Sequence, residues 1–311
     1  MTRAAALAAF LADSPWAGAT RLPLAGDASL RRYERLEGGP SPALLVDAPP
    51  PEDTALFVCM ADWLRGQGLL SPEIHRADTE AGFLLVEDLG DGLLARLCAD
   101  RPDAEAGLYD RAVAELVRLQ EAPVPDFLPA YDDAFFLFEI GIFAEWAAAD
   151  LPAPVQDDLL RRWRDVLPAA RVGRDVVVHR DFHALNLLAV GERFALIDFQ
   201  GARIGPPAYD LISLLVDARR DVAEDTVAAA AARYLDLRPE LDAERFTAAC
   251  AIMAAQRTTK ILGLFRRLAV RDGKAGYQAL LPRVRTQLQQ ALDHPALEPI
   301  RDWHARHGLG S

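Results

Sequence analysis

The chain has 311 residues, enough to bury the core of one large domain or of two moderate ones. With 51% hydrophobic and 26% charged residues it has an ordinary globular composition, and its uncharged runs are far shorter than the ~20 apolar residues of a membrane span. The formal net charge of -12 argues against general nucleic-acid binding, which needs a basic surface, so we expect neither a nucleic-acid nor a membrane partner.

The first residues of the chain fit two interpretations. Their apolar side chains recur at the spacing of an amphipathic helix: Ala4, Leu7, Ala8 and Leu11. The small residues at 17–19 also give the segment a faint resemblance to a secretory signal. We favour the helix, because the apolar run is only weakly hydrophobic and Asp13 follows it directly.

The first 90 residues predict a small, sheet-rich lobe. Short strand-like runs are separated by turn residues such as Gly38 and Gly39, and their sequences are TRLPL, SLRRYERLE, PALLVDAP, EIHRAD and GFLLVEDLG. Between the third and fourth runs, apolar residues at helical spacing predict a helix over residues 52–65.

The pattern becomes helical beyond Gly90. The predicted elements are helices over 103–119, over 135–149 and over most of the chain from 208 onward, with the short strands DVVVH and FALID within 176–198. We therefore expect an α+β, two-lobed fold, with a β-rich lobe over residues 1–90 and a larger, mainly helical lobe over residues 91–311.

The loop between the two short strands carries polar residues that fit one reaction. His179, Asp181 and Asn186 form the pattern H-x-D-x-x-x-x-N, and Asp198 follows at the end of the second strand. In phosphoryl transfer from a nucleotide, the protein mainly positions the reactants and neutralises charge. Mg²⁺ needs a few hard oxygen ligands, and a carboxylate beside the acceptor hydroxyl orients it and takes its proton.

The pattern assigns a role to each of these residues. We expect Asp181 to be the catalytic base and His179 to support the loop. Asn186 and Asp198 are the expected ligands of Mg²⁺. The alternative is a β-hairpin whose polar loop simply faces water. We favour catalysis, because the second aspartate follows at a suitable distance and a β-rich lobe precedes the motif.

The sequence resembles the aminoglycoside/choline phosphotransferase superfamily of small-molecule kinases, which have a protein-kinase-like fold. The resemblance runs nearly from end to end, and its motifs are HRDFHALN (179–186), LIDFQGARIGPPAYDL (196–211) and FLLVEDLGD (83–91). It implies ATP as the phosphoryl donor, and it implies that Asp210 supports the catalytic loop from below. Softer motifs, including GDASLRRYERL (26–36), are similar to those of bacterial kinases that phosphorylate the anomeric hydroxyl of N-acetylmuramate and N-acetylglucosamine in peptidoglycan recycling.

The nucleotide side departs from the usual pattern. Kinases of this fold hold the phosphates with a lysine on the third strand, but this chain has no lysine before Lys260. An arginine can replace a lysine electrostatically, and among Arg31, Arg32 and Arg35 we favour Arg32. The alternative is that these arginines are solvated, as charge runs usually are. Glu52 fits two roles, as the partner of an arginine or as a favourable charge at a helix start.

Two further nucleotide contacts are expected along the backbone of the first lobe. The turn from Gly26 to Ser29 would cover the phosphates with backbone N–H groups, as a glycine-rich loop does. The resemblance implies that the backbone from Glu87 to Leu89 holds the adenine.

A basic segment suggests what the acceptor is. Residues 251–287 contain eight positive residues and one acid, Asp272. Polycationic aminoglycosides would be repelled by this segment, whereas a sugar with a carboxylate would be attracted. We expect Arg257 or Lys260 to pair with that carboxylate. The alternative is a basic helix that faces solvent.

Two other features point to a sugar. Glu139, Phe143 and Trp146 share one predicted helical face, where an acid beside aromatic rings would suit a pyranose. The alternative is an aromatic stripe in the core. His183, two residues after Asp181, would point near the acceptor, or it is a structural histidine.

These observations predict an ATP- and Mg²⁺-dependent kinase that converts an N-acetylated amino sugar to its 1-phosphate by direct in-line transfer. The alternatives are a kinase of another small alcohol (an aminoglycoside, a choline-like alcohol or homoserine) and a nucleotide-binding regulator without turnover. We expect no obligate protein partner. Three widely separated cysteines predict a reducing compartment, the cytoplasm.

Overall fold

The computed structural model describes residues 2–24 and 30–308. The chain forms two compact units: the first consists of Met1–Pro102 and Leu185–Gly201, and the second consists of Asp103–Ala184 and Ala202–Ser311. The predicted catalytic loop, from His179 to Asn186, therefore begins in the second unit and ends in the first.

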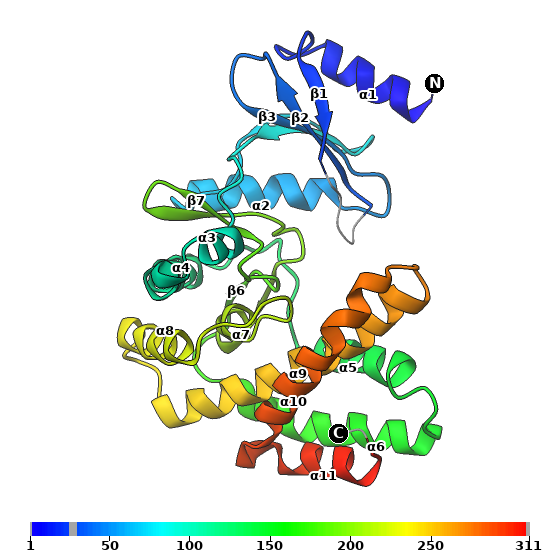
Figure 1. Cartoon of the computed structure of the whole chain (residues 1–311), viewed down its shortest axis with the longest axis vertical. Helices are drawn as coiled ribbons and strands as arrows, with labels where there is room; N and C mark the ends of the chain where they lie inside the picture. Colours follow the sequence, from blue (N-terminus) through cyan, green and yellow to red (C-terminus); the bar gives the residue numbers. More distant parts are fainter. Residues whose placement is uncertain (1, 25–29, 309–311) are drawn as a thin grey trace. The chain divides into compact units, whose positions relative to one another are not determined.

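A five-stranded antiparallel sheet forms the centre of the first unit, in the order β1-β2-β3-β5-β4 (Figure 1). Its strands are β1 (Thr20–Pro23), β2 (Arg32–Glu37), β3 (Ala43–Asp47), β4 (Ile74–Asp78) and β5 (Phe83–Glu87). The unit also contains α1 (Arg3–Ala12), α2 (Thr54–Gly66), α3 (Leu94–Asp100) and a hairpin of β7 (Leu187–Val190) and β8 (Arg193–Leu196). All five strands predicted from the strand-like runs are confirmed.

Each face of this sheet is covered by one helix. Successive strand residues point to opposite faces, so Leu45 and Val46 of β3 belong to different cores. Leu45 lies in a core that includes Leu7 and Phe10 of α1. Val46 lies in a second core, against which Phe57 of α2 packs. The amphipathic helix predicted at the start of the chain is thereby confirmed as α1.

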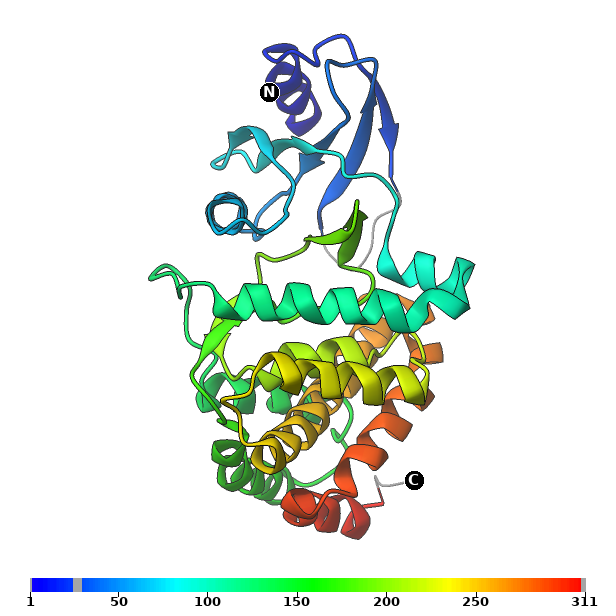
Figure 2. The ribbon, with the colours of Figure 1, turned by 90° about the vertical axis from the view of Figure 1, so that its left-hand side faces the viewer.

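The second unit is mainly helical. Its helices are α4 (Glu105–Glu121), α5 (Asp133–Trp146), α6 (Ala153–Val166), α7 (Ala208–Leu215), α8 (Glu224–Leu237), α9 (Ala243–Val270), α10 (Leu281–Leu292) and α11 (Glu298–Arg306). Two short strands, β6 (Val176–Val178) and β9 (Arg203–Gly205), pair with each other, and 3₁₀ turns lie at Pro102–Ala104, Leu167–Ala170, Ala275–Leu280 and Pro295–Leu297. Helices α4 and α8 lie side by side (Figure 2). Within residues 2–24 and 30–308, no helix has both the length and the apolar character needed to cross a membrane.

Helix α9 is the packing centre of the second unit. It contacts α5, α7 and α10, and Asp242 caps its first turn by accepting from the backbone N–H of Arg245. At Gly263 the helix approaches α5 so closely that a Cβ atom would lie 2.5 Å from the backbone nitrogen of Phe143. Polar residues are also buried on α9, among them Arg257 and Lys260. This burial of charge on a central helix points to the candidate site.

Candidate functional site

The start of the catalytic loop is held by a buried carboxylate. Strand β6 leads into His179, and Asp210 lies in the first turn of α7 with no exposed surface. Its two oxygens accept from the backbone N–H groups of His179 at 2.5 Å and Arg180 at 2.9 Å. Burial raises the pKa of Asp210 to about 7, against the lowering effect of these hydrogen bonds. These are the contacts of a residue that supports the loop.

Backbone strain marks this loop and the segment that follows β8. Arg180 has a φ of 72°, and Asp198 has a φ of 61°; among the described residues, no other non-glycine residue has a positive φ. Such conformations cost energy and concentrate at functional sites. The Arg180 guanidinium binds Glu139 Oε1 at 2.6 Å and lies 5.2 Å from the centre of the Tyr131 ring.

Asp181 presents an ionised carboxylate. Its side chain is 46% exposed, and the guanidinium of Arg257 lies 3.9 Å from Oδ1. Burial by itself raises the pKa of Asp181, but nearby positive charges, with Arg257 and Lys260 first, hold that pKa well below its usual range. At neutral pH the carboxylate is therefore ready to accept a hydrogen bond from a hydroxyl group.

Glu139 is the centre of a buried polar network and does not face the surface. It is 2% exposed and binds Lys260 Nζ at 2.7 Å. Besides Arg180 and Lys260, it accepts from the Tyr131 hydroxyl at 2.6 Å and from Gln256 Nε2 at 3.3 Å. Burial raises the pKa of Glu139, yet Lys260 and Arg180 bring it below the ordinary value.

This network corrects part of the expected acceptor site. Glu139 and Lys260 were expected to contact the sugar, but each is buried against the other. Arg257 is 3% exposed, and its Nη1 donates to the backbone oxygen of Arg180 at 3.0 Å. Phe143 is also buried and lies against His304, whereas Trp146 is half-buried, so Glu139 and Phe143 offer no open face to a pyranose and the contact at Trp146 stays a prediction.

His183 lies inside the loop, beside Asp181. It is 4% exposed, and its backbone N–H donates to the backbone oxygen of Asp181 at 2.9 Å. Burial lowers the pKa of His183 to about 4, with a further lowering by Arg219, so the imidazole is neutral at pH 7. Arg219, whose Nη1 lies 3.3 Å from His183 Nε2, was not singled out from the sequence.

The expected metal ligands belong to the first unit. The backbone oxygen of Asn186 accepts from Ile197 N–H at 3.1 Å, which brings Asn186 beside the residue that precedes Asp198. Asp198 Oδ1 accepts from Arg31 Nη1 at 3.2 Å and Gln200 Nε2 at 2.9 Å. Within the described ranges, Oδ2 of Asp198 has no hydrogen-bond or ion-pair partner.

This donor set suits Mg²⁺, which prefers few protein oxygens and keeps several waters. A carboxylate oxygen and a nearby carboxamide residue provide such ligands. In the part of the chain that the structure describes, there is no group of three His, Cys, Asp or Glu side chains able to hold a metal ion. A carboxylate and a carboxamide are compatible with an ion that also binds phosphate oxygens.

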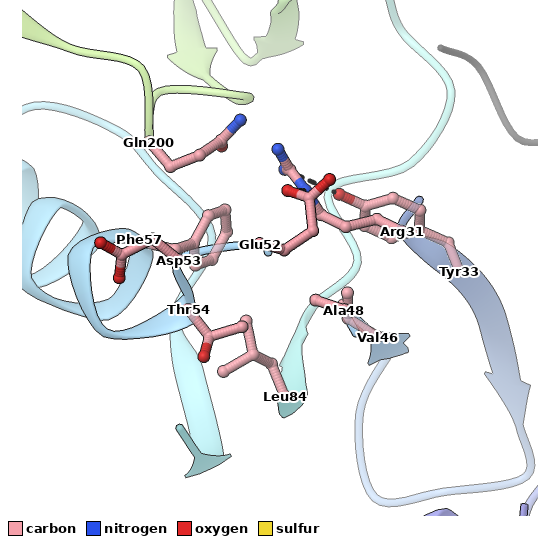
Figure 3. A pocket seen from close by; sticks show the side chains of 10 residues that line it. All are labelled: Arg31, Tyr33, Val46, Ala48, Glu52, Asp53, Thr54, Phe57, Leu84 and Gln200. Carbon is pink, nitrogen blue, oxygen red and sulfur yellow. Dashed lines mark hydrogen bonds and ion pairs between the residues drawn. The ribbon is translucent and has the colours of Figure 1, made fainter. Parts of the chain in front are cut away.

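A pocket of the first unit is lined in part by Arg31 and Gln200 (Figure 3), and both of these side chains donate to Asp198. Its lining combines apolar residues of the sheet and of α2 with a charged group: Arg31, Tyr33, Val46, Ala48, Glu52, Asp53, Thr54, Phe57, Leu84 and Gln200. Arg31 is 8% exposed and binds Glu52 Oε2 at 2.9 Å as well as Asp198. Glu52 is therefore the partner of an arginine, and Asp53 is the residue that caps α2.

The buried arginine of this pocket is Arg31, whereas the sequence favoured Arg32. Arg32 is the first residue of β2 and its side chain is exposed. Adjacent residues of an extended chain point to opposite sides, so only one of the two can reach Glu52 and Asp198. The structure thus provides a cation beside Asp198 without a lysine on β3.

The expected adenine segment has one free backbone position. The N–H of Glu87 donates to Glu73 and the N–H of Asp88 donates to Pro42. For Leu89, neither the N–H nor the C=O has a hydrogen-bond partner among the described residues. The side chain of Arg35 fixes the segment through an ion pair with Asp88 at 2.5 Å. The expected phosphate contacts at Gly26 and Ser29 lie outside the described residues.

Comparisons with known proteins agree with this arrangement. Residues 20–246 match the family described as the phosphotransferase enzyme family. The chain is 36% identical to the N-acetylmuramate/N-acetylglucosamine kinase of Caulobacter vibrioides, over 98% of this chain and 96% of the relative. It is 35% identical to the protein of the same name from Pseudomonas aeruginosa, over 87% of this chain and 83% of the relative.

Solved structures with the same fold are more distant in sequence. A choline/ethanolamine kinase family protein from Mesorhizobium loti has a TM-score of 0.66 at 16% identity and covers 100% of both chains. The GDP complex of aminoglycoside 2'-phosphotransferase-IIIa has a TM-score of 0.68 at 15% identity, over 91% of this chain and 98% of that chain. The predicted α+β, protein-kinase-like fold class is confirmed.

Proposed function

This chain belongs to the phosphotransferase enzyme family, and on that premise we propose that it is an ATP-dependent sugar kinase. Its acceptor is the anomeric hydroxyl of N-acetylmuramate or N-acetylglucosamine, and its product is the sugar 1-phosphate. The names of its relatives, which match along most of their length, support the acceptor class. The observation that carries the reaction type is the ionised, half-exposed carboxylate of Asp181 on a loop held by Asp210.

In the proposed reaction, Asp181 binds and orients the anomeric hydroxyl. The hydroxyl oxygen forms a bond to the γ-phosphorus of ATP while the bond from that phosphorus to the β–γ bridging oxygen breaks, and ADP leaves. Asp181 accepts the proton. An anomeric hydroxyl is more acidic than an ordinary alcohol, so a carboxylate with a lowered pKa suffices, and its main contribution is orientation.

The first unit would bind the nucleotide. Arg31, kept in place by Glu52, is positioned to bind phosphate oxygens with a charge-assisted hydrogen bond. The free N–H and C=O of Leu89 suit the edge of adenine. Asp198 Oδ2 and the side chain of Asn186 would hold Mg²⁺, which when bound neutralises charge on the phosphates. His179 would keep the loop in place from its buried position.

The cellular setting is also part of the proposal. ATP and the widely separated cysteines suit the cytoplasm, and the two sugars suit a role in peptidoglycan recycling. A nucleotide-binding regulator without turnover was suggested by the missing lysine. Arg31 removes that reason, because it supplies a buried cation next to Asp198.

Phosphorus NMR tests the function. The protein is incubated with ATP and Mg²⁺ together with N-acetylmuramate, N-acetylglucosamine or kanamycin, each in a separate reaction. We expect a sugar 1-phosphate resonance and ADP with either amino sugar, and no product with kanamycin. Asp181→Asn, which keeps the shape of the side chain, should bind ATP and form no product. A product with kanamycin alone would refute the proposed acceptor.

A further inference from the structure

The two proposed sugars differ in one group that a protein can recognise by charge. N-acetylmuramate carries the carboxylate of a lactyl ether, and N-acetylglucosamine does not. A cation that recognises this carboxylate must lie near Asp181 and must not already be neutralised by an acid of the protein. Arg257 and Lys260, the cations expected from the sequence, fail this requirement, because both are buried and hold internal acids or backbone oxygens.

Arg219 meets the requirement. It lies in the segment after α7, its side chain is half-buried, and its Nη1 is 3.3 Å from Nε2 of His183. The Phe265 ring lies below the guanidinium, with 5.9 Å between Cζ and the ring centre. In the part of the chain that the structure describes, Arg219 forms no ion pair. Its neighbour Arg220, by contrast, binds Glu105, and Arg283 binds Asp221 at 2.7 Å.

The backbone that carries Arg219 is fixed at two points. Asp217, which is 1% exposed, accepts from the backbone N–H of Arg219 at 2.8 Å through Oδ1. The backbone oxygen of Asp217 in turn accepts from Gln287 Nε2 of α10 at 2.9 Å. A guanidinium on an anchored segment loses less entropy on binding than one on a mobile loop. Arg219 is thus preorganised beside the catalytic loop.

The contact with His183 also fixes a tautomer. A guanidinium can only donate, so the hydrogen bond requires Nε2 of a neutral His183 to accept, and the ring proton lies on Nδ1. Nδ1 is buried and has no hydrogen-bond partner among the described residues. Arg219 therefore holds His183 in one tautomer, two residues from Asp181.

We propose that Arg219 binds the carboxylate of the acceptor and makes the enzyme prefer N-acetylmuramate over N-acetylglucosamine. The inference rests on the kinase function proposed above and assigns its acceptor specificity. A guanidinium binds a carboxylate with two parallel hydrogen bonds, which adds geometric selectivity to the charge. His183 holds the guanidinium in place by accepting a hydrogen bond from it.

Substitution of Arg219 by glutamine tests this assignment. The amide can still donate to His183 Nε2, but it has no charge for a carboxylate. We expect kcat/KM for N-acetylmuramate to fall roughly 10- to 100-fold, mainly through KM, because a hydrogen bond to a charged group contributes ~1.5–3 kcal/mol. For N-acetylglucosamine, kcat/KM should stay within about twofold of that of the unaltered enzyme. This result would also show that the variant is folded. Arg219→Lys should recover part of the loss.

Arg285→Gln is the control, since it removes an exposed positive charge of the basic segment 251–287. This variant should have the same kcat/KM as the unaltered enzyme for both sugars. If Arg219→Gln lowers kcat/KM equally for both sugars, the specificity role is overturned. It is also overturned if kcat/KM falls for neither sugar. If the unaltered enzyme phosphorylates neither sugar, the kinase function itself fails, and the specificity inference falls with it.

Discussion

At the scale of single residues, the adjacent Arg31 and Arg32 have different environments. Arg31 is buried between Glu52 and Asp198, and Arg32 is exposed at the start of β2. Only the buried side chain is near the carboxylate expected to hold the metal ion. Its charge can therefore act on phosphates that the same ion would bind, whereas the charge of Arg32 is screened by solvent.

Alanine substitution at each of the two positions separates their roles. Arg31→Ala should lower kcat/KM for ATP roughly 10- to 100-fold, because a charge-assisted hydrogen bond to phosphate is lost and Glu52 is left unpaired. Arg32→Ala should change it by less than about twofold. Steady-state kinetics with ATP as the varied substrate measure both. A larger effect at Arg32 than at Arg31 would restore the expectation drawn from the sequence.

The motif residues could be chosen from the sequence because their spacing carries the information. Asp181, Asn186 and Asp198 remain predicted catalytic and metal-binding residues. The choice between Arg31 and Arg32 depends on which side of an extended chain faces Glu52, which composition does not reveal. The pairing of Glu139 with Lys260 joins residues far apart in sequence, so it could not be predicted from a helical face. Arg219 gave no signal, because an arginine in a charged segment is ordinary.

At the scale of elements, periodicity was sufficient to predict the main helices and strands. The helix predicted over 52–65 is α2, Thr54–Gly66, and the helix predicted over 135–149 is α5, Asp133–Trp146. Their starts are set by the capping residues Asp53 and Asp132, which lie just before the apolar periodicity. The close approach of α9 to α5 was not predictable, because it depends on which face Gly263 occupies.

Gly263 allows a stability test of this approach. In Gly263→Ala the new methyl group would lie 2.5 Å from the backbone nitrogen of Phe143, so α9 and α5 must separate. We expect the free energy of unfolding to fall by about 1–3 kcal/mol, as in other overpacked cores. Urea denaturation followed by circular dichroism measures this change.

The matched control for this substitution is Gly141→Ala, within α5. Apart from the chain neighbours of Gly141 and the backbone of α5 itself, no described atom lies within 4 Å of a Cβ added there, and alanine is the better helix former. This variant should be more stable by roughly 0.5–1 kcal/mol. Equal destabilisation in the two variants would show that the effect at Gly263 is not caused by helix contact.

For the whole molecule, the motifs that carry the family resemblance were enough to predict the fold class and the kinase family. The lobes expected over 1–90 and 91–311 remain a prediction. The compact first unit also includes Leu185–Gly201. Strands β7 and β8 of this segment form backbone hydrogen bonds to Gly92 and Leu70. The chain returns to the first unit through contacts between segments that are far apart in sequence. Local sequence patterns do not predict such contacts.

Two buried groups give the whole molecule a pH dependence of stability with opposite signs. The pKa of His183 is lowered by burial to about 4 from a reference value of 6.5. Between these values the unfolded chain binds more protons, so stability rises with pH. The pKa of Asp210 is raised by burial to about 7 from 3.8, and in that range the folded protein binds more protons, so stability falls with pH.

The two effects should nearly cancel over about pH 5 to 6, where each contributes close to ~1.4 kcal/mol per pH unit. We therefore expect the free energy of unfolding of the unaltered protein to be almost flat there. In His183→Gln only the Asp210 effect remains, and stability should fall as pH rises; in Asp210→Asn it should rise. Urea titrations at a series of pH values measure the three slopes. The two substitutions remove contributions of opposite sign. If the free energy of unfolding has the same slope against pH in both variants, the opposite pKa shifts of His183 and Asp210 are contradicted.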